Sequence, residues 1–175
     1  MVLYRGVAVD PGSTRLRRSL EAQLAKLPAG GTRAIAATHH HEEHVGNLDW
    51  LAARTGAPLF LGEETARRLR PPGRIPRMRD AIIGQPPALT GSYTPLVPGA
   101  SVRIGDVTLR VFAAPGHSDD HVVLYDPERK VLLAGDAFMG AYFATPNPDV
   151  DSRRWIESLD ALLALPIEVL VEGHG

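Results

Sequence analysis

Four of the seven histidines of this 175-residue chain lie in the six positions from 39 to 44, in the stretch THHHEEH. Imidazole nitrogens and carboxylate oxygens are common metal ligands. Alternate residues of an extended loop face the same side, so His39 and His41 can chelate one cation. Glu43 and His44 can reach a second cation beside it. The stretch predicts one wall of a metal site, although alone it could be a solvated loop or an adventitious metal binder.

Three other parts of the chain offer candidate ligands in a similar setting. Four apolar, strand-like runs each lead to one metal-capable side chain just past their end: His39, His117, Asp136 and His174. Ligand sites of α/β sheets lie at the carboxyl ends of strands, so we expect these four residues to converge. His117 would complete three nitrogens on the first metal, His174 would add a nitrogen to the second, and Asp136 could bridge both.

The donor set limits the choice of metal. The chain has no cysteine, so any metal must be held by histidine and carboxylate side chains. This set suits Zn²⁺, and Fe and Mn are the alternatives. Two metals about 3.5–4 Å apart would hold a bridging hydroxide that is present at neutral pH. We therefore predict two zinc ions, held in part by the carboxylates of Asp136 and Glu43.

Alternating strands and helices are predicted to position these residues. The predicted strands are 34–37, 58–61 and 169–171, with hairpins at 101–113 and 122–134, and residues 7–9 are a short apolar run before a turn signal. The predicted helices are 13–27, a helix from 45 or 46 onward, 62–69 and 152–165. The segment 70–98 is rich in proline and glycine and is predicted to be irregular. The sequence contains no repeat or linker, so we expect a single domain over residues 1–175.

Composition narrows the class of protein. Hydrophobic residues make up 44% of the chain and the formal net charge is -1, which is a globular composition without a sign of a nucleic-acid partner. The sequence has neither a signal-peptide core nor an apolar stretch long enough for a membrane. We expect a cytoplasmic protein with a small-molecule substrate, whose oligomeric state the sequence leaves open.

Together these motifs resemble the metallo-β-lactamase superfamily, whose signature is T-H-x-H-x-D-H followed by a P-G-H turn, a G-D turn and a terminal G-H. The corresponding positions here are 38–44, 115–117, 135–136 and 173–174. Residues 9–12, VDPG, also resemble the I-D-T-G turn that precedes the first helix of the family. The resemblance implies an α/β fold, an αββα four-layer sandwich of two mixed β-sheets, with a hydrolytic dinuclear site and a glyoxalase II-like metal motif.

The chain departs from the family pattern in three ways. Glu43 stands where the family has aspartate, so we expect a weaker second metal site with partial occupancy. Only about nine residues precede the D-x-G turn, and the chain ends one residue after His174. We therefore expect N-terminal strands and a C-terminal helix of the family to be missing.

Four residues near the motifs have open roles. His40 is expected at the surface or behind the ligands, since alternation points it away from the metals. His121 is expected to orient its loop or to face solvent. Asp10 is interpreted as a turn former or as a partner of a ligating histidine. Tyr142 could contact substrate or pack.

A cluster of arginines suggests an anionic substrate. Six arginines lie in a segment that often folds over the active-site mouth in the resembled family: Arg67, Arg68, Arg70, Arg74, Arg77 and Arg79. Guanidinium groups recognise phosphodiesters and carboxylates. The alternative is a solvated surface rich in arginine.

The leading hypothesis implied by the resemblance is a metal-dependent hydrolase whose metal-bound hydroxide attacks a carbonyl of a thioester, a lactone or another small ester or amide. In this mechanism Asp136 and Glu43 are the catalytic carboxylates. One alternative is a phosphodiesterase-like hydrolase, which only the arginines support. Another is a mononuclear iron enzyme of the persulfide dioxygenase type, or a degenerate metal-binding protein without hydrolytic turnover.

Overall fold

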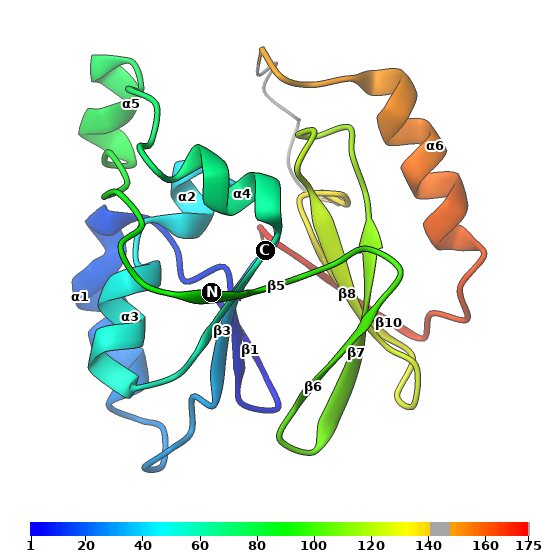
Figure 1. Cartoon of the computed structure of the whole chain (residues 1–175), viewed down its shortest axis with the longest axis horizontal. Helices are drawn as coiled ribbons and strands as arrows, with labels where there is room; N and C mark the ends of the chain where they lie inside the picture. The colour runs from blue at the N-terminus through cyan, green and yellow to red at the C-terminus, as the bar shows by residue number, and fades with distance from the viewer. Residues whose placement is uncertain (141–147, 175) are drawn as a thin grey trace. The chain divides into compact units, whose positions relative to one another are not determined.

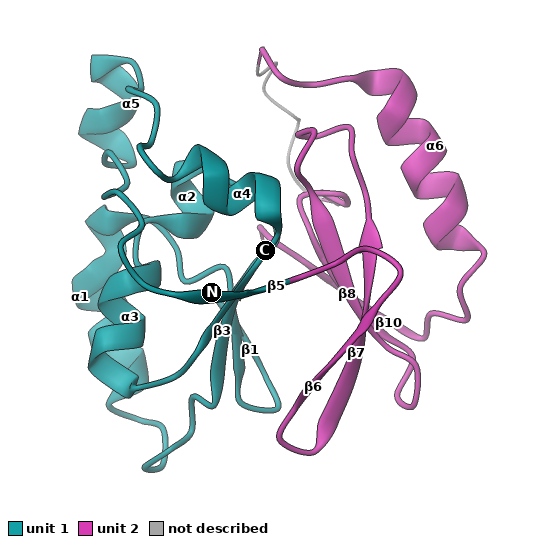
Figure 2. Ribbon diagram, in the orientation of Figure 1, with its two compact units in different colours: residues 1–95 teal, residues 96–175 magenta. Residues whose placement is uncertain are grey.

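The computed structural model describes residues 1–140 and 148–174. The chain divides into two compact units, Met1–Pro95 and Leu96–Gly175 (Figure 2). Each unit contains its own five-stranded sheet. Both sheets combine parallel and antiparallel pairs, so the predicted α/β class with two mixed sheets is confirmed.

The sheet of unit 1 has the order β1-β2-β3-β4-β5 (Figure 1). Its strands are β1 (Val2–Tyr4), β2 (Val7–Val9), β3 (Ala34–Ala37), β4 (Leu59–Leu61) and β5 (Tyr93–Pro95). Only β1 is antiparallel to its neighbour. The three central strands are buried along their whole length, as expected for parallel strands that are covered on both faces. The sequence predicted β3 and β4, marked β2 only as a short apolar run, and missed β1 and β5.

Six helical segments accompany this sheet: η1 (Thr14–Leu16), α1 (Arg17–Leu24), α2 (Glu42–Val45), α3 (Leu48–Thr55), α4 (Glu63–Arg68) and α5 (Arg77–Ile82). Ser13 caps the first one, as predicted, because its side chain accepts a hydrogen bond from the Arg15 backbone N–H. The prediction of an extended loop through position 44 is wrong. Two glutamates occupy the first turn of α2, where negative charge stabilises a helix N-terminus.

The sheet of unit 2 has the order β10-β9-β8-β7-β6. Its elements are β6 (Ser101–Ile104), β7 (Val107–Ala113), β8 (Val122–Asp126), β9 (Val131–Gly135), α6 (Ser152–Leu163) and β10 (Val169–Glu172). Both predicted hairpins form, and β10 pairs parallel to β9 after the chain passes through α6. Of the apolar residues predicted on one side of α6, Leu162 is buried, whereas Ile156 and Leu163 are exposed. Across the described residues, no helix is both long enough and apolar enough to cross a membrane.

In each sheet, the register of one parallel strand pair places predicted site residues just after the carboxyl ends of the two strands. In unit 1, β2 and β3 run parallel with Val9 opposite Ala36, so the turns that carry Asp10 and His39 leave the same edge. In unit 2, β9 and β10 run parallel with Gly135 opposite Glu172. Asp136 and His174 therefore also leave one edge together.

Candidate metal centre

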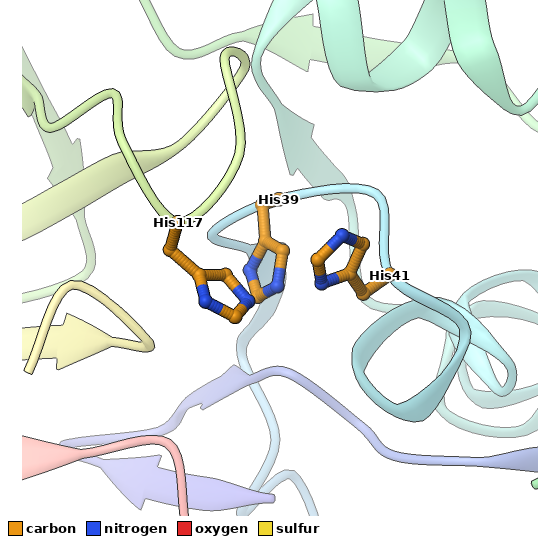
Figure 3. A group of neighbouring side chains, drawn as sticks. All are labelled: His39, His41 and His117. Carbon is orange, nitrogen blue, oxygen red and sulfur yellow. The ribbon is translucent and has the colours of Figure 1, made fainter. Parts of the chain in front are cut away.

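The first set of predicted ligands lies on unit 1, directly after β3. The side chains of His39, His41 and His44 are all buried, and the His39 ring lies against the other two rings. The ring centroid of His39 lies 4.6 Å from that of His41 and 4.2 Å from that of His44. His44 arrives there through the turn of α2, in which its backbone N–H donates to the His41 carbonyl. Figure 3 shows His39 and His41 on the loop that leads into this helix.

Asp10 holds two of these imidazoles in place. Its carboxylate accepts hydrogen bonds from the Thr38 backbone N–H at 2.8 Å and from the Thr38 hydroxyl at 2.9 Å. The Thr38 hydroxyl lies 2.9 Å from Nδ1 of His39, and Oδ2 of Asp10 lies 3.1 Å from Nδ1 of His44. Carboxylates that fix the second nitrogen of a histidine in this way orient metal ligands. Asp10 also forms the turn itself, with a φ of 53°, so both roles considered for it are present.

Glu42 and Glu43 are both held by Arg79 of α5. Nε of Arg79 donates to Glu42, and Nη2 lies 3.3 Å from each carboxylate oxygen of Glu43. Burial raises the pKa of Glu43, but its backbone hydrogen bond and the charges of His44 and Arg79 outweigh burial, so the pKa lies below its ordinary value. Glu43 is therefore an anion at neutral pH. Sequence reasoning placed Arg79 only in a cluster of arginines and missed this pairing.

The second set of predicted ligands lies on unit 2. Oδ2 of Asp136 lies 3.4 Å from Nε2 of His117 and 3.2 Å from Nε2 of His174. The backbone N–H of Asp136 donates to Nε2 of His121 at 3.1 Å. His121 is 1% exposed, so it orients the Asp136 turn and does not face solvent.

The turn that carries His117 depends on a glycine and on a tryptophan. Gly116 has a φ of 145°, and a Cβ at this position would collide with the backbone of Trp155 in α6. Nε1 of Trp155 donates to the Ala137 carbonyl at 2.7 Å, and its ring stands edge-on to His117 at a centroid distance of 5.4 Å. Figure 3 draws His117 on this turn. The sequence held no local signal for Trp155, because its contacts come from α6 packing on unit 2.

The donor chemistry of both sets fits a divalent metal ion. Unit 1 offers three neighbouring imidazoles, and unit 2 offers a carboxylate between two imidazoles. Burial of such polar groups costs free energy unless they gain partners. Nitrogen and oxygen donors without sulfur suit Zn²⁺, Fe or Mn.

Comparison with known proteins identifies the family. The family model described as the metallo-beta-lactamase superfamily matches residues 7–174. The chain belongs to the metallo-beta-lactamase superfamily. It is 30% identical to a hydroxyacylglutathione hydrolase of Dechloromonas aromatica, over 95% of this chain and 52% of that protein. It is 28% identical to the probable metallo-hydrolase YybB of Bacillus subtilis, over 93% of this chain and 73% of that protein. The chain thus spans about half the length of the hydroxyacylglutathione hydrolase.

Solved structures of other proteins share the fold of this chain. A metallo-beta-lactamase family protein of Thermus thermophilus superposes with a TM-score of 0.77 at 28% identity, over 95% of this chain and 64% of that one. The protein TTHA1623, solved in a di-iron-bound form, gives a TM-score of 0.72 at 28% identity, over 95% of this chain and 80% of that one. These likenesses show the α/β fold of the superfamily.

Most of the arginine cluster is engaged within unit 1. Arg67 and Arg68 both pair with Glu64 on α4, and Arg70 lies over the Tyr93 ring. Arg74 and Arg77 are exposed. These contacts, with those of Arg79, weaken the argument that the cluster recognises an anionic substrate.

Two other residues complete the comparison with the sequence predictions. His40 is half-buried, and its Nε2 lies 3.4 Å from Nη1 of Arg68. Tyr142 lies outside the described residues.

Proposed function

We propose that this member of the superfamily is a metal-dependent hydrolase that acts on a carbonyl substrate: a thioester, a lactone or another small ester or amide. The observation that carries the proposal is the cluster of buried imidazoles at positions 39, 41 and 44, oriented by Asp10 and Thr38. The family membership and the relatives named hydroxyacylglutathione hydrolase support it. Their name makes an acylglutathione thioester the first substrate to test.

We further propose that both ligand sets serve one metal centre. His39, His41 and His117 would hold the first metal, and His44, Asp136, His174 and Glu43 would surround the second position. The order of the motifs along the chain and the family match support this assignment. When bound, the metals would polarise the substrate carbonyl and lower the pKa of a water molecule. Zinc is the metal proposed, with Fe or Mn as alternatives.

The protein's own residues would orient the reacting groups. Asp10 and Thr38 fix His39 and His44, so these imidazoles need little reorganisation when substrate binds. Asp136, with its backbone held by His121, would keep its carboxylate between the imidazoles of unit 2. Glu43 is ionised and would orient the attacking water in the proposed mechanism.

A substrate panel on metal-reconstituted protein tests the proposal. Initial rates would be measured for a thioester, a lactone, a β-lactam and bis-p-nitrophenyl phosphate, with metal content measured in parallel. We expect turnover of the thioester or the lactone. Turnover of the phosphodiester alone would favour the phosphodiesterase alternative and overturn the carbonyl proposal.

A second candidate is an iron enzyme of the persulfide dioxygenase type or a metal-binding protein without hydrolytic turnover. It is favoured by the pairing of Glu43 with Arg79, which would weaken the second metal position and leave a mononuclear site. Metal analysis separates the candidates. One iron per chain would support this one, and two zinc ions per chain would contradict it.

A further inference from the structure

Arg79 of α5 forms ion pairs with both glutamates of the 39–44 stretch, Glu42 and Glu43. It lies 37 residues after Glu42 and 36 residues after Glu43 in the sequence. The side chains of Arg79, Glu42 and Glu43 are 29%, 8% and 22% exposed. Ion pairs at this degree of burial are less screened by solvent than pairs at the open surface. Solvent therefore weakens these ion pairs less than it weakens an ion pair at the open surface.

Two contacts in the C-terminal half of α5 hold the backbone of the helix that carries Arg79. Nη2 of Arg15 donates to the Asp80 carbonyl at 3.0 Å, and the Ser13 hydroxyl donates to the Ile83 carbonyl at 2.5 Å. Both contacts tie the helix to the start of η1, which follows the turn of Asp10. Arg79 thus approaches the glutamates from an anchored backbone position.

The single carboxylate of Glu43 is already engaged by Arg79. Both of its oxygens face the same guanidinium nitrogen of Arg79. A metal that used this carboxylate would have to displace or share the guanidinium, and the positive charge of Arg79 would oppose the approach of a cation. The extra methylene of glutamate is therefore not the only reason to expect a weak second site.

We propose that Arg79 competes with the second metal for Glu43, so that the ion pair keeps one of the two metal positions weak. This inference rests on the proposed function, because it takes Glu43 as a ligand of the second metal. It makes Arg79 a positioning residue that sets metal stoichiometry from outside the ligand set.

Zinc titration of the metal-depleted protein tests the inference. Calorimetry would compare the unmodified protein with Arg79→Met, which removes the charge but keeps a long side chain. We expect the second Zn²⁺ to bind roughly tenfold more tightly in Arg79→Met, the factor typical of one charge-assisted hydrogen bond. Arg77→Met is the matched control, because Arg77 is an exposed arginine of the same helix. This control should leave the second affinity within about twofold of the unmodified value.

Glu43→Gln closes a double-mutant cycle. If Arg79 acts through Glu43, Arg79→Met should tighten the second Zn²⁺ in the Glu43 background and have little effect in the Glu43→Gln background. Equal tightening in both backgrounds would overturn the inference, because it would reflect general charge repulsion. Unchanged or weaker binding in Arg79→Met would also overturn it.

Two further measurements keep these outcomes clear. Circular dichroism would check that Arg79→Met is folded, since it leaves the buried Glu42 without its partner. The double variant Arg79→Met/Glu42→Gln removes both charges of the Arg79–Glu42 ion pair. It should bind the second Zn²⁺ as tightly as Arg79→Met alone does. Failure of every variant to bind any Zn²⁺ would overturn the proposed function and this inference together, whereas normal binding without the Arg79 effect would overturn this inference alone.

Discussion

The predicted ligands of unit 1 and those of unit 2 are brought together by different parts of the structure. The histidines of unit 1 are neighbours in the sequence, and the turn of α2 together with the Asp10 carboxylate brings their rings together. The predicted ligands of unit 2 come from three separate turns, and the pairing of β9 with β10 and the packing of α6 bring them together. The first set should depend on a few local contacts, whereas the second should depend on the fold of its whole unit.

The largest effect is expected at Asp136, on which the second set is centred. Asp136→Ala removes the carboxylate that lies between His117 and His174. We expect metal content to fall and kcat/KM to drop by more than about 100-fold, which exceeds the usual effect of a residue that only supports a ligand. Metal analysis, kinetics and circular dichroism would check this in one preparation. A folded variant with full activity and full metal content would exclude Asp136 from the mechanism.

The second largest effect is expected on the first set of predicted ligands, when Asp10 is substituted. Asp10→Ala removes the partner of Thr38 and His44, and we expect metal affinity to fall roughly 10- to 100-fold. Asp10→Asn is the matched control, because asparagine tolerates the positive φ and can still accept from the Thr38 backbone N–H. Its loss should be smaller. Equal losses in the two variants would assign the effect to charge alone.

Gly116 tests whether unit 2 depends on its packing. Gly116→Ala would place a Cβ against the Trp155 backbone at a φ of 145°, and we expect a loss of about 2 kcal/mol or more in the free energy of unfolding. Gly99 of the same unit also has a positive φ, but a Cβ there meets nothing within 4 Å. Gly99→Ala should cost only about 1 kcal/mol. Urea titration of both variants measures the difference, and similar losses would show that strain outweighs packing.

The smallest effect is expected at Glu64 of unit 1. The hydrogen bond from Arg67 is the main cause that lowers the pKa of Glu64 to about 2. Because the folded pKa lies below the unfolded value of about 4.5, the stabilisation is present above pH 4.5 and is lost as the pH falls toward 2. Solvent screening limits it to a few tenths of a kcal/mol. Thermal melts of the protein and of Glu64→Gln should therefore converge as the pH falls from 6 to 3, and a constant difference would contradict this origin.

The sequence predicted the strands better than the short helices. Apolar runs such as residues 34–37 and alternating hairpins carry a local signal, and their bounds agree closely with the structure. The helices α2 and α5 are only four and six residues long, too short to be stable without tertiary contacts. The edge strands β1 and β5 were missed because each has only one neighbour in the sheet and is partly exposed.

Residue types and their order along the chain determined the donor chemistry, the absence of sulfur ligands and the family signature, because these are properties of the side chains themselves. Tertiary structure decided what each group contacts. Three contacts join segments that are distant in the sequence. They are the ion pair of Arg79 with Glu43, the hydrogen bond from the Asp136 backbone N–H to His121, and the ring contact of Trp155 with His117. Such contacts form only when the fold has already brought the segments together, and no local pattern in the sequence encodes them.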